Sequence, residues 1–73
     1  MLSMQKCRLR SGLTQSELGK MVGVAQRTIA AYEVGTRKPS PAVFKRLMDV
    51  FGLTLEEAWE MFYGDDEGKE GDE

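Results

Sequence analysis

The amino-acid sequence predicts an all-α protein, a compact bundle of five short helices followed by an acidic tail. Apolar residues recur at helical spacings in short runs. Each of the first four runs is followed by a glycine, at positions 12, 23, 35 and 52, where a helix can stop. Residues that cap helix N-termini precede four of the five runs, namely Ser3, Thr14, Ser40 and Thr54. The 73 residues allow one domain with one small core.

The first helix is expected within residues 1–11. Met4 and Cys7 are three residues apart and therefore share one helical face, and Ser3 is placed to cap the helix. Gly12 then ends it. We interpret Cys7 as a small buried hydrophobic residue rather than as a redox or nucleophilic group.

The second helix is expected to begin after Thr14. Thr14 and Glu17 have the spacing of a capping box, in which each side chain bonds the other residue's backbone amide. Gly19 lacks a side chain and would let the next helix approach closely, and Gly23 accepts the left-handed backbone of a helix stop. The predicted buried face of this helix consists of Leu18, Met21 and Val22.

The third helix is expected at residues 26–34, with Ile29 and Tyr32 facing inward. Ala25 stands at the cap position and cannot bond the first turn. Two short helices joined by a tight turn with a glycine are the sequence form of a helix-turn-helix, here at about residues 14–34. In that unit the second helix enters the major groove of DNA. The outward side chains, which are the candidates for reading base edges, are Gln26, Arg27, Thr28 and Ala31.

Two further segments are candidates for holding DNA phosphates. Gln15 lies in the first turn of the second helix, beside backbone amides that favour an anion. The loop after the third helix carries two cations. Taken alone, it would be read as an ordinary solvated loop, but its place next to the helix pair favours a phosphate clamp. The clamp residues are Thr36, Arg37 and Lys38.

The fourth helix is expected to start at Ser40-Pro41, because Ser caps and Pro fits the first helical position. It ends at Gly52. The fifth starts at a second capping box, Thr54 with Glu57, and runs to about Tyr63. Its predicted apolar face consists of Leu55, Ala58, Trp59 and Phe62.

The C-terminal helix has more apolar surface than a chain of this size is expected to bury. Two interpretations stay open: an apolar helix packed on its own core, or a homodimer contact. The contact would consist of Trp59, Met61, Phe62 and Tyr63. Residues 64–73 contain no apolar side chain and are expected to form a disordered tail. Solubility is its default role, with repulsion of DNA and docking to a basic partner as alternatives.

The net charge of −2 conceals a strong segregation of charge along the chain. Residues 1–46 hold nine Lys or Arg and two Glu, a net charge of +7. Residues 47–63 have a net charge of −4, and residues 64–73 a net charge of −5. A local basic face is what phosphate binding requires, so an acidic chain as a whole does not argue against DNA.

The composition weighs against an enzyme or a metalloprotein. The sequence has no histidine, which removes the commonest general base and the commonest metal ligand, and its single cysteine excludes an internal disulfide. No cofactor or metal site is expected. No stretch has the length and apolarity of a membrane span or of a signal peptide, and we expect a cytoplasmic protein.

An ordered set of residues resembles the phage-repressor and Cro-like helix-turn-helix family, often called the XRE family. The set comprises Gly12-Leu13-Thr14-Gln15-Ser16-Glu17-Leu18, Val22-Gly23-Val24, Ile29, Tyr32-Glu33, Gly35 and Gly52-Leu53-Thr54-Leu55-Glu56-Glu57. No single motif is decisive, but the whole set at this spacing is specific, and it covers residues 4 to 62.

The resemblance implies a five-helix bundle of the lambda-repressor type that binds operator DNA as a dimer. By matched position, Gln15 would contact a phosphate, the outward side chains of the third helix would face the major groove, and residues 36–38 would meet the backbone. Arg8 and Glu33 match a buried ion pair that links the first and third helices in some members. The sequence departs from the family at Ala25, at Ala31 and in the acidic tail.

The leading hypothesis is therefore a sequence-specific transcriptional regulator, a repressor of bacterial or phage type, that binds a pseudo-palindromic operator as a homodimer. The second is an antitoxin or a protein-interaction module that uses the same fold, with the apolar C-terminal helix and the acidic tail as its contact surface. An enzyme has little support, since no nucleophile–base pair, metal cluster or phosphate-cradling glycine loop is visible.

Overall fold

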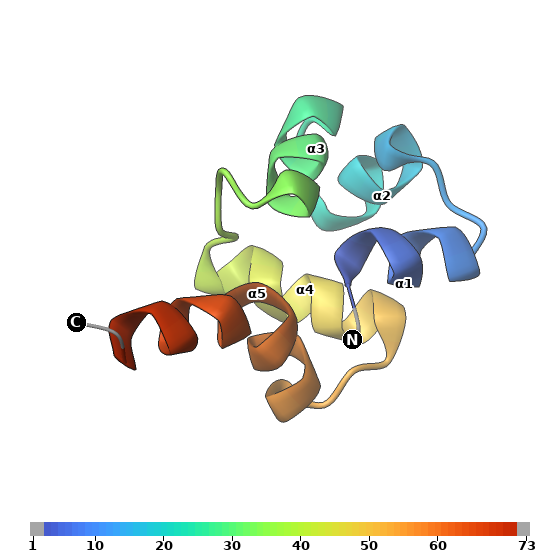
Figure 1. Ribbon diagram of the computed structural model, residues 1–73. Helices are drawn as coiled ribbons and strands as arrows, with labels where there is room; N and C mark the ends of the chain where they lie inside the picture. The colour runs from blue at the N-terminus through green and yellow to red at the C-terminus, as the bar shows by residue number, and fades with distance from the viewer. Residues whose placement is uncertain (1–2, 72–73) are drawn as a thin grey trace.

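The computed structural model describes the backbone of residues 3–71 and the side chains as far as Gly64 (Figure 1). Within these residues it consists of helices and their connections, with no strand. The five predicted helices are confirmed: α1 (Met4–Arg10), α2 (Gln15–Val22), α3 (Gln26–Val34), α4 (Pro41–Phe51) and α5 (Leu55–Gly71).

Local capping explains where the helices begin. Thr14 Oγ1 accepts a hydrogen bond from the amide of Glu17 at 3.0 Å, and a Glu17 carboxylate oxygen accepts one from the amide of Thr14 at 2.9 Å. Thr54 and Glu57 form the same reciprocal pair before α5. By contrast, Ala25, the residue that precedes α3, makes no side-chain capping bond. Its position must therefore depend on packing rather than on its own first turn.

The turn between α2 and α3 depends on two glycines. Gly23 ends α2 with φ +83°, a left-handed conformation that side chains disfavour. Gly19 lies inside α2, and a Cβ atom there would be 2.5 Å from the carbonyl oxygen of Val24. The predicted close approach at position 19 is therefore present, but the group that approaches is the turn before α3 rather than the helix itself.

The core lies between the α2–α3 pair and the helices α4 and α5 (Figure 1). Four side chains at its centre have no solvent exposure, and they come from α2, α3 and α4: Leu18, Val22, Ile29 and Leu47. Met4 of α1, Tyr32 of α3 and Phe62 of α5 extend this core. Every helix therefore contributes a side chain to one cluster.

Three residues expected on the apolar faces of their helices are exposed. Met21 of α2 is 54% exposed, and Leu55 and Trp59 of α5 are 63% and 47% exposed. Helical spacing alone placed these residues inward, but a face is buried only where another element covers it. In α2 the buried residues are Leu18, Gly19 and Val22, so the covered stripe runs beside Met21 rather than over it.

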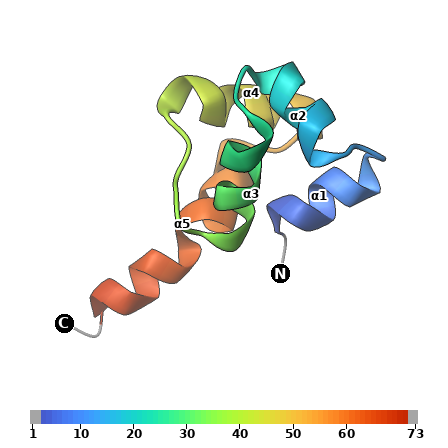
Figure 2. The same cartoon turned by 90° about the horizontal axis from the view of Figure 1, so that it is seen from above.

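The helix α5 continues beyond the expected end at Tyr63, as far as Gly71. Figure 2 shows this extension projecting away from the other four helices. The described core reaches Tyr63 and no further along α5. The helix therefore runs into the acidic segment, which has no apolar side chain to add to the core. Residues 72 and 73 of the predicted tail lie outside the described residues.

Candidate nucleic-acid interface

Backbone hydrogen bonds fix the path of the chain where it leaves α2 and enters the turn before α3. The amides of Gly23 and Val24 both donate to the carbonyl oxygen of Gly19, at 2.8 and 2.9 Å. Arg46 of α4 adds a bond from its Nη1 to the carbonyl oxygen of Val22 at 3.3 Å. This contact, which no local sequence pattern indicates, satisfies an end carbonyl of α2 from 24 residues away.

The helix α3 has one buried and one open face. Ile29 is fully buried and Tyr32 is 8% exposed, as expected. On the other face Gln26 and Arg27 are exposed. Of the remaining outward candidates, Thr28 and Ala31 are half-buried. The four side chains proposed to read bases therefore occupy the accessible side of α3, with Gln26 and Arg27 the most accessible.

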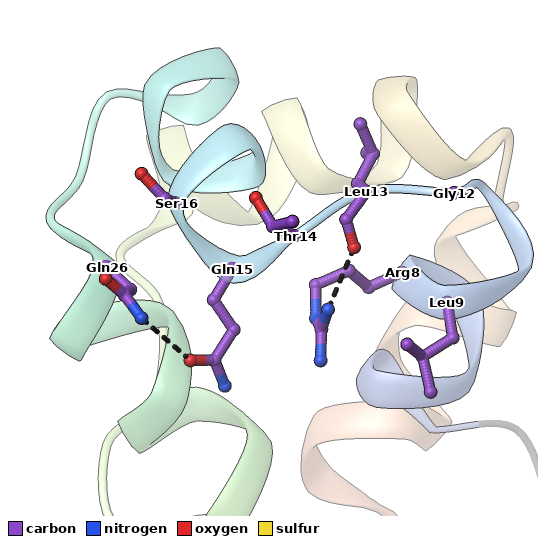
Figure 3. A pocket seen from close by; sticks show the side chains of 8 residues that line it. All are labelled: Arg8, Leu9, Gly12, Leu13, Thr14, Gln15, Ser16 and Gln26. Atoms are coloured by element: carbon purple, nitrogen blue, oxygen red, sulfur yellow. Dashed lines mark hydrogen bonds between the residues drawn. The ribbon is translucent and has the colours of Figure 1, made fainter.

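A surface hollow of about 510 Å³ lies where α1, α2 and α3 meet. It is lined at the start of α2 by Thr14, Gln15 and Ser16, and at the start of α3 by Gln26. Figure 3 shows Gln15 and Gln26 pointing toward each other across this hollow. The candidate phosphate-contacting residue and the first candidate base-reading residue are thus neighbours in space.

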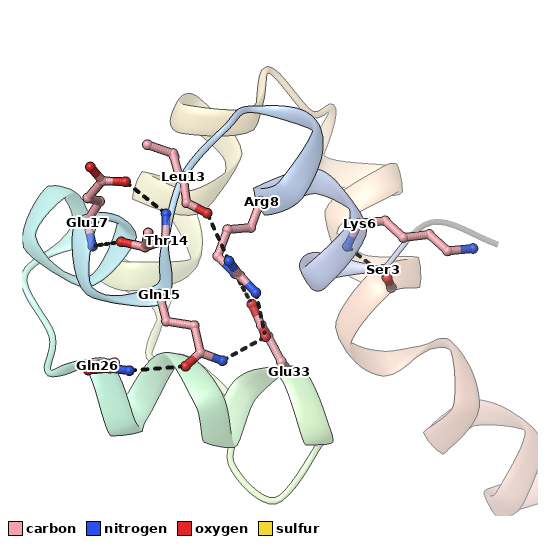
Figure 4. Close-up of polar contacts among 9 residues, drawn as sticks. All are labelled: Ser3, Lys6, Arg8, Leu13, Thr14, Gln15, Glu17, Gln26 and Glu33. Atoms are coloured by element: carbon pink, nitrogen blue, oxygen red, sulfur yellow. Dashed lines mark hydrogen bonds and ion pairs between the residues drawn. The ribbon is translucent and has the colours of Figure 1, made fainter.

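Arg8 and Glu33 form the ion pair that the resemblance implies, between α1 and α3. Arg8 Nε donates to Glu33 Oε2 at 2.6 Å, and the two side chains are only 9% and 6% exposed. Arg8 Nη1 also donates to the carbonyl oxygen of Leu13 at 2.8 Å. One guanidinium therefore joins α1 to α3 and to the segment before α2 (Figure 4).

Gln15 has partners within the protein that the sequence did not reveal. Its Nε2 donates to Glu33 Oε1 at 3.0 Å, and its Oε1 accepts a bond from Gln26 Nε2 at 3.4 Å. The residues of these pairs are 18 and 11 positions apart in the chain, so no local pattern reports the contacts. The Arg8–Glu33 pair, recognised only through the resemblance, would have been the one indication of such a network.

The three candidate clamp residues after α3, Thr36, Arg37 and Lys38, are all exposed. Thr36 Oγ1 donates to the carbonyl oxygen of Ala31 at 3.3 Å, which ties the start of the loop to α3. Lys38 Nζ lies 5.5 Å from the ring centroid of Tyr63, within the range of a cation–π contact. The loop therefore runs between the open face of α3 and the aromatic side of α5.

The four residues proposed for a homodimer contact do not share one environment. Trp59 is 47% exposed, and its ring centroid lies 4.3 Å from that of Tyr63. Met61 and Tyr63 are half-buried. Phe62 is 6% exposed and belongs to the core, so its inclusion in the contact surface is wrong. On a helix, four consecutive or near-consecutive residues point in different directions, and Phe62 points inward.

The remaining candidate chemistry is structural. Burial raises the pKa of the Cys7 thiol, an effect that Arg10 opposes and Glu57 reinforces. A protonated, buried thiol fits the interpretation of Cys7 as a small hydrophobic residue.

Among the described residues, no group of three His, Cys, Asp or Glu side chains is arranged to hold a metal ion. In the same part of the chain, no helix combines the length and apolarity needed to span a bilayer.

Comparisons with known proteins agree with this geometry. A family model described as helix-turn-helix matches residues 4–57. The chain is 38% identical over 60 residues to an uncharacterized HTH-type transcriptional regulator of Archaeoglobus fulgidus, covering 82% of this chain and 81% of the relative. It is 38% identical over 55 residues to the uncharacterized HTH-type transcriptional regulator MJ0272 of Methanocaldococcus jannaschii, covering 75% and 80%.

A third relative comes from Bacillus subtilis. It is the uncharacterized HTH-type transcriptional regulator YgzD, 33% identical over 55 residues, covering 75% of this chain and 83% of the relative. No solved structure matches the chain. The family match covers α1 to α4 and the start of α5, including every residue of the network around Glu33. The chain therefore belongs to the XRE family of helix-turn-helix transcriptional regulators.

Proposed function

We propose that this protein is a sequence-specific repressor of transcription that binds a pseudo-palindromic operator as a homodimer through α3. The observation that supports the proposal best is the two-faced character of α3. Ile29 and Tyr32 fix the helix on the core, while Gln26 and Arg27 stand exposed on its outer side. A helix held in this way can enter a major groove without disturbing the bundle.

The proposed contacts divide into those that read sequence and those that fix register. Arg27 can bond guanine, Gln26 can bond adenine, and the Thr28 methyl can meet a thymine methyl, with Ala31 allowing close approach. Gln15 and the exposed cations of the loop at 36–38 would meet phosphates on either side of the groove. We propose that such contacts are made with double-stranded DNA in the cytoplasm of a bacterial or phage-infected cell.

The homodimer is proposed because one short helix reads few bases. The helix α3 has nine residues, and its candidate reading side chains lie within two turns, so a second copy would be needed for useful specificity. Trp59 and Tyr63 on α5 supply an aromatic surface for the contact. Met61, which is half-buried, is the remaining candidate for it. A dimer seated on a promoter would occlude it, which is why repression is proposed.

Selection of bound duplexes from a random pool tests the activity directly. We expect enrichment of a pseudo-palindrome whose half-sites are about 10 base pairs apart, the repeat of one helical turn. Failure to enrich any sequence, at low as well as moderate salt, would reject specific DNA binding.

Sedimentation of the free protein, with Trp59→Ala as the variant and Met21→Ala as the matched exposed control, tests the proposed dimer contact. Only Trp59→Ala should lower self-association. Equal effects of the two substitutions would remove α5 from the proposal.

An antitoxin or protein-interaction module is the second candidate. It is favoured by the exposure of Leu55 (63%) and Trp59 (47%), which lie near each other on α5 and line one hollow with Glu56 and Glu60. This candidate would require that duplexes fail to bind while a partner protein covers that surface. The random-pool selection therefore separates the two candidates.

A further inference from the structure

A chain of hydrogen-bonded side chains runs from the interior of the bundle to the open face of α3 (Figure 4). It starts at the Arg8–Glu33 pair. Glu33 Oε1 accepts from Gln15 Nε2 at 3.0 Å, and Gln15 Oε1 accepts from Gln26 Nε2 at 3.4 Å. A nearly buried carboxylate is thus connected, through one glutamine, to a side chain proposed to read a base.

The chemistry of the groups fixes the direction of both bonds. A carboxylate paired with a guanidinium offers acceptor oxygens only, so Gln15 can approach Glu33 only with its NH2 group. The oxygen of Gln15 is then turned toward Gln26, and only the NH2 group of Gln26 can meet it. Without the carboxylate at the inner end, either amide could rotate by 180° and exchange its donor for its acceptor.

We propose that Glu33 is a positioning residue for DNA recognition, which acts through Gln15 to hold the amide of Gln26 in one orientation. The inference rests on the proposed function of α3 as the reading helix. In this orientation, the Gln26 oxygen is left to accept a bond and one of its N–H groups is left to donate. Adenine offers an amino donor beside an acceptor in the major groove, and meets both; guanine offers two acceptors and does not.

The solvent exposure of Glu33 and Gln26 agrees with a relay of hydrogen bonds rather than with an incidental contact on the surface. Arg8 donates to both oxygens of Glu33, from Nε to Oε2 at 2.6 Å and from Nη2 to Oε1 at 3.5 Å. Gln15 shares Oε1, and the Glu33 side chain is 6% exposed, so it is not itself available to DNA. Gln26 at the outer end is exposed. Glu33 can therefore influence base choice only through the residues between it and the groove.

The experiment measures base preference at one position of the binding site. That position is first identified as the one where Gln26→Ala abolishes discrimination. Glu33→Gln then keeps the shape of the side chain but supplies a group that donates as well as accepts. We expect discrimination at the identified position to fall about tenfold, the scale of a hydrogen bond to a charged group, while preferences at the other positions are kept.

A structural role alone predicts a different result. Loss of the ion pair would reduce the folded fraction and weaken all duplexes by one common factor, leaving every preference intact. Gln15→Met provides a second variant that retains the Arg8–Glu33 pair, and therefore the fold, while breaking the relay. It should reproduce the loss of discrimination at the same position, together with a uniform loss from the missing phosphate contact.

Rescue gives the sharpest test. Combining Glu33→Gln with Gln15→Glu moves the carboxylate one step outward, where it again accepts only from the NH2 group of Gln26. We expect discrimination to return although total affinity falls, because the new charge repels phosphate. Uniform weakening in Glu33→Gln, or no return of discrimination in the combined variant, overturns the relay. A preference that survives Gln26→Ala also overturns it and leaves DNA binding standing, whereas absence of any specific binding rejects the proposed function itself.

Discussion

Single side chains on α3 and on the loop that follows it are proposed to contact different parts of the same DNA, the base edges and the phosphates. Arg27 is exposed on the open face of α3, and Arg37 is exposed in the loop. A base-edge contact discriminates between sequences, whereas a phosphate contact adds affinity to all of them. The two arginines therefore form a matched pair, because one chemical change can be made at both positions.

Arg27→Ala should relax base preference at one position of the site by about 1–3 kcal/mol. Arg37→Ala should weaken all duplexes alike and reduce the slope of log affinity against log salt by about 0.9 for the lost phosphate. Competition binding at several salt concentrations measures both quantities. Identical behaviour of the two variants would contradict the division of labour.

The ion pair between Arg8 and Glu33 sets the stability of the same region. Because both side chains are nearly buried, Arg8→Ala leaves a carboxylate without its cation in a place that water hardly reaches. We expect a loss of about 3–5 kcal/mol in the free energy of unfolding, measured by denaturant titration. Arg10→Ala, the same change on the exposed side of α1, should stay within about 0.5 kcal/mol. A loss for Arg8→Ala no larger than that of the control would refute the assignment.

At the scale of the element, the turn of the helix pair α2–α3 depends on the lack of a Cβ atom at Gly19. A Cβ at position 19 would lie 2.5 Å from a backbone oxygen, which cannot move without moving the turn. By contrast, a Cβ at position 64 would meet the end of the Glu60 side chain, which can rotate away. Both glycines are in helices, so alanine would otherwise be favoured at both.

Gly19→Ala should therefore destabilise the protein by about 1–3 kcal/mol, the usual result of overpacking, and should weaken DNA binding beyond what unfolding explains. Gly64→Ala should be neutral or stabilising by up to about 1 kcal/mol. Thermal unfolding and duplex binding of the two variants, side by side, provide the measurement. Full stability in Gly19→Ala would mean that the turn adapts.

How far the sequence predicts these elements depends on whether the cause is local. Helix starts at Thr14 and Thr54 and the stop at Gly23 were predictable, because capping and backbone conformation involve residues within three or four positions. Met21 and Leu55 were misplaced because their burial is decided by which helix covers them. The bonds of Gln15 to Glu33 and Gln26 were invisible for the same reason, since they join separate helices.

On the scale of the whole molecule, the uneven distribution of charge along the chain follows the order of the elements. Exposed cations stand on α2, on α3 and on the loop after α3, namely Lys20, Arg27, Arg37 and Lys38. The end of α5 projects away from the bundle and leads into the acidic segment (Figure 2). The net charge of −2 would become +3 without residues 64–73, which have a net charge of −5. Long-range attraction to DNA is therefore opposed by the protein's own terminus.

Truncation after Tyr63 should accelerate association with DNA at low salt, by up to about tenfold, and the gain should disappear as ionic strength increases. Stopped-flow association at two or more salt concentrations measures the effect. Stability should change little, because residues 64–73 contain no apolar side chain that could be lost from the core. If the association rate at low salt is unchanged, the segment serves another purpose, such as solubility.

The contact between Lys38 and Tyr63 has a mechanical consequence. The Tyr63 ring packs against the exposed ring of Trp59, and Lys38 Nζ lies over the Tyr63 ring. Only these two aromatic side chains therefore separate the outer surface of α5 from the loop beside α3. If α5 is the surface on which two copies meet, as proposed, a partner resting on Trp59 would lie next to the ring that Lys38 covers. We therefore expect substitutions at Trp59 to alter the proposed phosphate contact of Lys38 as well as self-association.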